Sequence, residues 1–191
     1  MSTALVGWGR KFVARKAIFR ILGNAFRLYG PEGNLQFYVK QKAFRLKEDI
    51  GVFTDDGQRN KALSIKARSI LDFGATYDVT DVKTGETVGA LKRNALKSMV
   101  RDEWSILGEG DAVVGKVQED SMLFALLRRF LAHAWLPQTF SIECGGASAG
   151  TIKQRFNPFQ LAYDVDLGDA VDPRLGVAAV VLLLAIEGRQ K

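Results

Sequence analysis

Near its C-terminus the chain reads Asp172-Pro173-Arg174-Leu175-Gly176-Val177-Ala178-Ala179-Val180-Val181-Leu182-Leu183-Leu184-Ala185-Ile186-Glu187-Gly188. The apolar middle of this stretch contains no charged residue and no hydroxyl group. Asp172 can accept hydrogen bonds from the free amides of a first helical turn, Pro173 is favoured at the first helical position, and Gly188 favours a stop. The pattern therefore predicts a helix over residues 173–187 that has no polar face.

A helix of this kind constrains the rest of the protein. An ordinary surface helix is apolar along one stripe only, whereas a helix that is apolar all round has to be buried on every side. About fifteen residues at ~1.5 Å each give roughly 22 Å, which is short of the ~30 Å hydrocarbon core of a bilayer. We therefore expect the chain to wrap this helix, and the alternative is a short membrane anchor.

Most of the chain before this helix alternates apolar and polar residues in short stretches separated by turn residues. Strand-like stretches occur at residues 35–39, 44–53, 63–67, 75–79, 88–92, 104–107, 113–117, 140–144, 151–156 and 161–167. A predicted helix at residues 121–134 interrupts the series. Many short antiparallel hairpins followed by one wholly apolar helix predict a closed sheet with the helix inside, because closure removes exposed strand edges.

The first thirty residues carry the whole excess of positive charge. They contain six basic residues and no acid, and the chain has a net charge of +6. Large aromatic residues fall close together when residues 8–28 are drawn on a helical wheel, so we expect a basic amphipathic helix here. The breaker at residues 30–34 would then separate an N-terminal helix, residues 1–30, from a barrel domain, residues 31–191.

Three interpretations of this N-terminal helix stay open. It can pack on the domain with a solvated basic face, lie on a membrane surface, or serve as a mitochondrial-type targeting segment. On a membrane, its contacting residues would be Trp8, Arg10, Lys11, Phe12, Arg15, Lys16, Phe19 and Arg20.

Residues suited to catalysis are few. The chain has one histidine, His133, and one cysteine, Cys144, on different predicted elements. A Cys–His nucleophile is conceivable, but a histidine at a helix C-terminus and a small core cysteine are the simpler interpretation. Too few thiols and imidazoles are present for a structural zinc site of four such ligands, and a single cysteine excludes an internal disulfide. We expect neither an enzyme nor a cofactor.

One acidic cluster precedes the C-terminal helix. Asp164, Asp166 and Asp169 are candidate calcium ligands, but the spacing does not fit an EF-hand. Counted from Asp164, the sixth position is Asp169 rather than glycine and the twelfth is Leu175 rather than glutamate. The simpler interpretation is a polar strand face followed by a loop.

Basic residues also gather in two later segments. Lysine and arginine can bind a phosphate head group as point charges or bidentate donors, although most such runs are solvated faces. The segments contain Lys40, Lys42, Arg45 and Lys47, and Lys92, Arg93, Lys97 and Arg101. We predict the second set as lipid-binding residues. The rest of the chain shows no basic stripe interleaved with aromatic residues, so we expect no nucleic acid partner.

Several motifs, taken in order, resemble one known family. Tyr38-Val39-Lys40-Gln41-Lys42-Ala43-Phe44, with Asp49-Ile50 and the Asp56-Gly57 turn, resembles the opening of LURP-one-related proteins. Tyr77-Asp78-Val79-Thr80-Asp81, with Gly85 and Val88-Gly89, does so as well. Asp172-Pro173-Arg174 and the apolar helix are similar to the C-terminus of the phospholipid scramblases, which are grouped with the tubby C-terminal domain. The resemblance covers roughly residues 35–191.

This resemblance implies a mainly β protein with α content, built as a closed antiparallel tubby-like barrel of about twelve strands around a buried C-terminal apolar helix. The N-terminal helix would lie outside the barrel. Tubby domains bind membrane phosphoinositides through basic surface residues, and scramblases are linked to calcium and lipid movement. LURP-one-related proteins have no agreed biochemical activity, though plant members are tied to defence. Fold similarity transfers none of these functions by itself.

We predict a non-enzymatic barrel that docks on anionic, phosphoinositide-like membrane lipid or on a protein partner. We expect it in the cytoplasm and peripheral at a membrane, with a mitochondrial location left open. The alternatives are scramblase-like lipid transport and an enzyme of unknown class.

Overall fold

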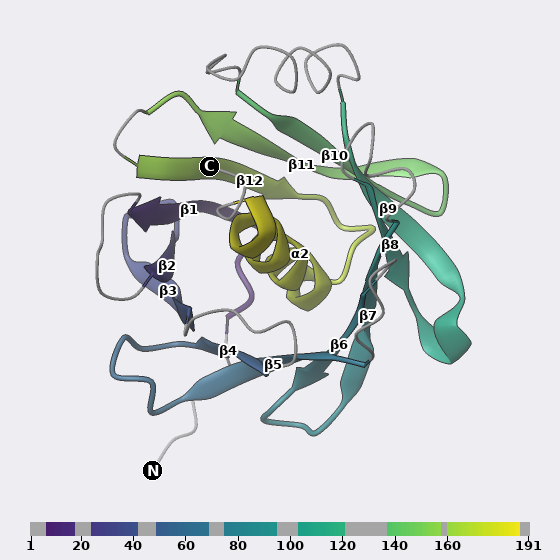
Figure 1. The fold of residues 1–191 in the computed structure, drawn as a ribbon, viewed down its shortest axis with the longest axis horizontal. Coiled ribbons are helices and arrows are strands. Elements are labelled where there is room, and N and C mark those ends of the chain that lie inside the picture. The colour runs from purple at the N-terminus through teal and green to yellow at the C-terminus, as the bar shows by residue number, and fades with distance from the viewer. Residues whose placement is uncertain are drawn as a thin grey trace.

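The computed structural model describes residues 7–17, 24–41, 49–68, 75–94, 103–120, 137–157 and 160–187. In these residues twelve antiparallel strands form one closed barrel, with each strand paired to its neighbours in chain order and β1 closing against β12. Helix α2 (Pro173–Glu187) runs through the middle of the barrel (Figure 1). The fold expected from the C-terminal stretch is thus confirmed.

The strands are short and evenly distributed along the chain. Their bounds are β1 (Lys11–Ala17), β2 (Asn24–Tyr29), β3 (Leu35–Gln41), β4 (Ile50–Phe53), β5 (Lys61–Ala67), β6 (Thr76–Asp81), β7 (Thr87–Arg93), β8 (Glu103–Leu107), β9 (Val113–Glu119), β10 (Thr139–Cys144), β11 (Ala147–Arg155) and β12 (Gln160–Leu167). A 3-10 turn, η2 (Glu109–Asp111), connects β8 to β9. The predicted helix at residues 121–134 lies outside the described residues. Of the strand predicted at residues 44–53, residues 44–48 also lie outside them, and Ile50–Phe53 form β4.

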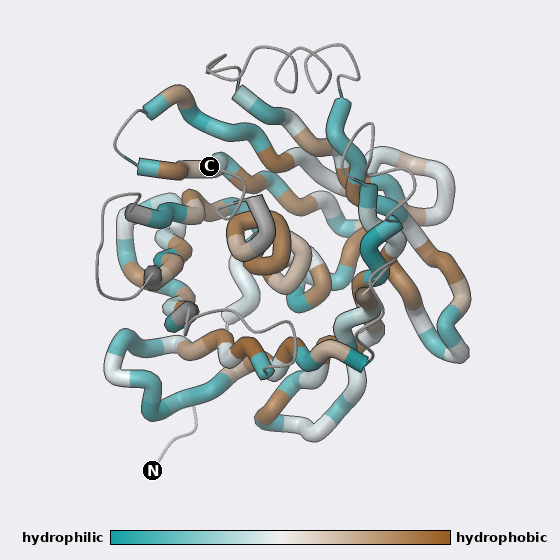
Figure 2. Tube along the Cα trace, in the orientation of Figure 1, coloured by the Kyte–Doolittle hydropathy of each residue, from teal (hydrophilic) through white to brown (hydrophobic). Residues whose placement is uncertain are grey.

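Helix α2 supplies the centre of the core. Its residues from Leu175 to Ala185 are buried on every side, and Val177, Val180 and Leu184 have no exposed surface. Figure 2 shows the helix as largely hydrophobic, whereas the strands around it alternate between hydrophobic and hydrophilic residues. Among the described residues, no helix is both long enough and apolar enough to cross a membrane.

One glycine lets the sheet approach the start of this helix. Gly89 on β7 has a φ of +150°, and a Cβ atom there would lie 2.5 Å from the carbonyl oxygen of Leu107 and 3.3 Å from a methyl group of Leu175. The register of β6 and β7 shifts next to this glycine, between Val79 and Thr80. The irregularity brings the β7 backbone against both β8 and the first turn of α2.

The expected N-terminal helix is wrong for the described residues, because they form strands β1 and β2 of the barrel. Phe12 and Ala14 on β1, like Phe26 and Leu28 on β2, are buried at every second position and face the interior. A helical wheel also groups these aromatic residues, but the period of two within each strand decides the structure. The barrel therefore begins at Lys11 rather than at residue 31.

Candidate functional site

Two of the aromatic residues expected to contact a membrane, Trp8 and Phe12, pack against or within the core. Trp8 stacks on Phe37, with ring centroids 5.0 Å apart and an interplanar angle of 18°, and only 3% of Phe12 is exposed. A folded barrel therefore cannot present Phe12 to lipid. Phe19 and Arg20 of the same predicted set lie outside the described residues.

Three of the basic residues in that set have structural contacts. Arg10 donates to the backbone carbonyl oxygens of Gly168 and Val171 and forms an ion pair with Asp169 at 3.3 Å. Lys11 pairs with Asp166 at 2.9 Å. Lys16 faces the interior, is 5% exposed, and has its ammonium group 5.0 Å from the centroid of the Phe26 ring.

Arg15 is the other basic residue of the predicted set that the structure describes. It belongs to a basic surface that we call the arginine face. It consists of Arg15, Arg27, Tyr29, Tyr38 and Lys40, all on the outer side of β1, β2 and β3. Arg15 lies directly opposite Arg27 in the β1–β2 pairing, and Arg27 lies directly opposite Tyr38 in the β2–β3 pairing. The residues that alternate with them are buried and face the interior, so these side chains lie on the outer side, where Tyr38 is covered and only 9% exposed. The alternating buried residues are Ala14, Lys16, Phe26, Leu28, Phe37 and Val39.

Each arginine of this face stacks on a tyrosine of the next strand. The Arg15 guanidinium carbon lies 5.1 Å from the centroid of the Tyr29 ring, and that of Arg27 lies 5.3 Å from the Tyr38 centroid. Such cation–π contacts contribute about 0.5–1 kcal/mol each at exposed sites. They hold both guanidinium groups against the sheet and leave their N–H edges uncommitted to any described residue.

The arginine face has no neutralising acid among the residues that the structure describes. Within the described ranges, no carboxylate forms an ion pair or hydrogen bond with Arg15, Arg27 or Lys40. Asp164 lies diagonally across from Arg15, but it is already held by Arg155 through contacts of 2.6 and 2.8 Å. Since like charges directly opposite each other in a sheet are destabilising, the barrel keeps the Arg15–Arg27 pair at a cost.

The structure does not bring the predicted lipid-binding set together. Lys92 and Arg93 are consecutive on β7 and therefore point to opposite faces of the sheet. Lys92 is exposed, whereas Arg93 lies opposite the buried Trp104 and is only partly exposed. Lys97 and Arg101 lie outside the described residues.

The candidate calcium ligands are also separated. Asp164, Asp166 and Asp169 pair with three different cations, Arg155, Lys11 and Arg10 respectively. No group of three or more histidine, cysteine or acidic side chains suited to a metal ion occurs in the part of the chain that the structure describes.

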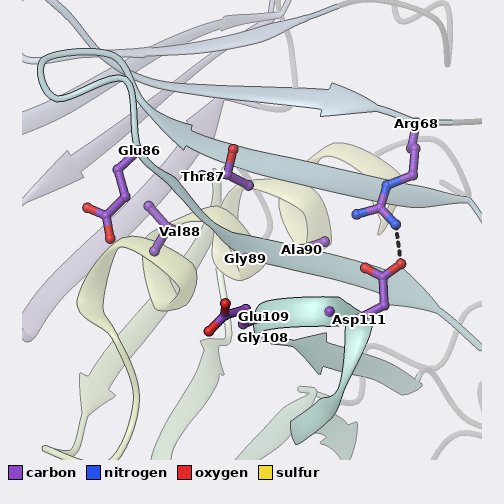
Figure 3. Close-up of a pocket in the computed structure, with 10 residues that line it drawn as sticks. Arg68, Glu86, Thr87, Val88, Gly89, Ala90, Gly108, Glu109 and Asp111 are labelled. Carbon is purple, nitrogen blue, oxygen red and sulfur yellow. Dashed lines mark hydrogen bonds and ion pairs between the residues drawn. The ribbon is translucent and has the colours of Figure 1, made fainter.

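A cleft of about 730 Å³ lies between β7 and η2 and is lined by Arg68, Glu86, Thr87, Val88, Gly89, Ala90, Gly108, Glu109, Gly110 and Asp111 (Figure 3). Arg68 bridges Asp78 and Asp111, with shortest contacts of 2.5 and 2.6 Å. The hydrogen bond from Arg68 lowers the pKa of Asp111 below its ordinary value. The one cation among the described lining residues is thus engaged by acids, and this part of the cleft offers little to an anionic ligand.

A second ionic group fastens the start of α2 to the β6–β7 turn. We call it the Arg174 cluster, and it contains Arg174, Asp172, Asp81 and Glu86. The guanidinium of Arg174 lies 2.8 Å from Asp172, 2.8 Å from Glu86 and 3.3 Å from Asp81. Burial acts to raise the pKa of Asp172, but hydrogen bonds from the Arg174 side chain and backbone N–H lower it below its ordinary value. Asp172 caps the helix as expected, because it accepts the Arg174 N–H at 2.8 Å.

The single thiol lies where its ionised form is disfavoured. Cys144 is a free, partly buried residue at the end of β10, and burial raises the pKa of its thiol. A higher pKa lowers the thiolate fraction at neutral pH. The alternative of a Cys–His nucleophile is not tested, because His133 lies outside the described residues.

The sequence did not predict that Arg15 shares an outer surface with Arg27 and Tyr29, or that Arg27 stacks on Tyr38. The available signal was the alternation of Arg27 and Tyr29 with the apolar Phe26 and Leu28, which is the pattern of a strand. The pairing of Arg15 with Arg27 depends on the register of two strands, and the alternation alone does not set that register.

The comparisons with known proteins agree with this architecture. The LURP-one-related family model matches residues 35–184, which run from β3 into α2 and cover most of the chain. Neither the curated proteins nor the solved structures give a significant match. The family sits in the tubby-like and phospholipid scramblase superfamily, and its members are generally not enzymes. The chain therefore belongs to the LURP-one-related family.

Proposed function

We propose that this protein is a non-enzymatic barrel that docks on anionic membrane surfaces through the arginine face. The observation that carries the proposal is the direct opposition of Arg15 and Arg27 without a carboxylate partner among the described residues. Two like charges directly opposite each other are costly for folding, so the pair favours a role in binding negative charge.

The expected strength of docking follows from the number of free cations. A lysine or arginine near an anionic leaflet contributes about 1 kcal/mol, so Arg15, Arg27 and Lys40 together give roughly 3 kcal/mol, or about 150-fold in partitioning. The rings of Tyr29 and Tyr38 lie beneath the guanidinium groups, and tyrosine is favoured at membrane interfaces because it combines an apolar ring with a polar tip.

Flotation with vesicles tests this proposal. The full chain would be mixed with phosphatidylcholine vesicles, with and without phosphatidylserine, at two salt concentrations. We expect binding only to the anionic vesicles and weaker binding at high salt, because salt screens exposed charges. In the Arg15→Gln/Arg27→Gln double variant, partitioning should fall by about 30-fold, which corresponds to ~2 kcal/mol.

A matched control removes the same charge elsewhere. Lys66 and Lys153 are exposed residues on β5 and β11, and the Lys66→Gln/Lys153→Gln variant has the same net charge of +4 as the double arginine variant, from +6 in the natural chain. Its binding should fall by less than about threefold. Equal losses in both variants would show a nonspecific charge effect and contradict the proposal. No binding by the natural chain would favour a protein partner instead.

A further inference from the structure

We infer that Arg15 and Arg27 together form a binding site for one phosphate monoester, presented by a lipid head group. The inference rests on the proposed docking function and adds the class of ligand that the arginine face selects. Both residues precede the segment matched by the family model, residues 35–184, so the site is a feature of this chain's own first two strands.

The geometry places two guanidinium groups side by side. Arg15 leans from β1 over Tyr29 of β2, and Arg27 leans from β2 over Tyr38 of β3. Tyr29 lies diagonally across from Arg15, whereas Tyr38 lies directly opposite Arg27. The two guanidinium groups therefore sit over a diagonal pair of positions on β2 and β3, roughly 7–8 Å apart, a gap that one phosphate group between them can span. A phosphate monoester has three terminal oxygens, which allows it to accept paired N–H donors from two neighbouring guanidinium groups at once.

The donors of this pair are available, in contrast to those of other arginines. Arg68, Arg155 and Arg174 donate to carboxylates at 2.5–2.8 Å. Arg15 and Arg27 contact tyrosine ring faces, which leaves the hydrogen-bonding edge of each guanidinium group uncommitted among the described residues. Lys40 lies diagonally across from Arg27 on β3 and can add a third positive charge.

Charge decides which anionic lipid fits best. A phosphate monoester carries about −1.5 to −2 at pH 7, whereas phosphatidylserine carries a net charge of about −1. Two adjacent guanidinium groups repel each other, and a single dianion placed between them removes that repulsion more fully than a monoanion does. The arginine pair should therefore prefer phosphomonoester lipids even when the total charge of the membrane is held constant.

The test compares vesicles of equal surface charge that contain either phosphatidic acid or phosphatidylserine. We expect the natural chain to partition about tenfold more strongly onto the phosphatidic acid vesicles. In the Arg15→Lys/Arg27→Lys variant the two charges remain but the paired donors of each guanidinium are lost, so the ratio of the two partition coefficients should fall to about one. The Lys66→Gln/Lys153→Gln variant should keep the tenfold ratio.

The outcomes separate this inference from the proposed function. If the natural chain binds both vesicles equally, or if the preference survives in the double lysine variant, the phosphomonoester site is overturned while membrane docking stands. If the natural chain binds neither vesicle, both are overturned. If micromolar glycerol 3-phosphate displaces the protein from the vesicles, the ligand is a soluble phosphate ester and the assignment to lipid is overturned.

Discussion

Replacement of Arg174 by methionine tests how the central helix is held in the barrel. The change keeps a long side chain but removes the guanidinium from three carboxylates. The side chain of Arg174 is 19% exposed, and those of Asp81, Asp172 and Glu86 are 10%, 31% and 55% exposed. The Glu86 pair is therefore expected to contribute less than about 1 kcal/mol, as exposed pairs do, and the Asp81 and Asp172 pairs more.

The summed effect should be a loss of about 2–4 kcal/mol in the free energy of unfolding. Most of this loss comes from Asp172 and Asp81, the two less exposed carboxylates, which would lose their paired cation. For a chain of this size, 1 kcal/mol shifts the melting temperature by about 2–4 °C, so we expect a decrease of roughly 5–15 °C. Urea unfolding followed by circular dichroism gives the free energy directly.

Arg155 provides the matched control. It makes the same kind of bidentate contact with Asp164, but the two side chains are 49% and 47% exposed. Arg155→Met should therefore cost less than about 1 kcal/mol. If Arg174→Met were no more destabilising than Arg155→Met, burial would not be what makes the Arg174 cluster strong, and the reasoning would be refuted.

The pH dependence gives a second check on the same variant. The pKa of Asp172 is held below its ordinary value of 3.8, so the stability from this pairing is present above about pH 4 and is lost as the pH falls through the folded-state pKa. The difference between the natural chain and Arg174→Met should accordingly be largest at neutral pH and shrink below pH 4. A difference that stays constant down to pH 3 would contradict this account.

Three further predictions concern the core and the single thiol. Leu184→Ala, in the last turn of the buried helix, should lower the free energy of unfolding by about 2–5 kcal/mol in a urea titration, and a loss below 1 kcal/mol would mean that α2 is not enclosed. Gly89→Ala should cost about 1–3 kcal/mol in the same assay, because its Cβ would lie 2.5 Å from the backbone oxygen of Leu107; an unchanged midpoint would argue against this close approach. Cys144 should react more slowly with iodoacetamide at pH 7.5 in the folded chain than in the urea-unfolded chain, since burial raises its pKa, and equal rates would count against that burial.

The sequence predicted the features that depend on local pattern. Helix α2 has the bounds that were expected, Pro173–Glu187, because its caps and its uniformly apolar composition are both encoded within the same stretch. Strands such as β6 and β12 were recognisable because polar and apolar residues alternate along them. The closed sheet followed from the need to surround a helix without a polar face.

Features that depend on long-range pairing could not be predicted in this way. Strand β1 pairs with β12, so that Lys11 lies opposite Asp166, and nothing near Lys11 in the sequence indicates this partner. The aromatic residues of the first thirty positions fit both a helical wheel and two short strands, and the structure resolves the ambiguity by closing the barrel. The arginine face arises only once β1, β2 and β3 are aligned, so no single segment contains it.

A spin label on the arginine face would test the central claim most directly. In a Cys144→Ser background, a nitroxide at Ala25→Cys would lie on β2 opposite Lys40, and one at Val113→Cys would lie at an exposed position of β9, on the other side of the barrel (Figure 1). On anionic vesicles, we expect the Ala25 label to gain exposure to oxygen and lose exposure to a water-soluble nickel complex, and the Val113 label to remain as in solution. The reverse pattern, or no change at Ala25 in vesicle-bound protein, would contradict docking through the arginine face.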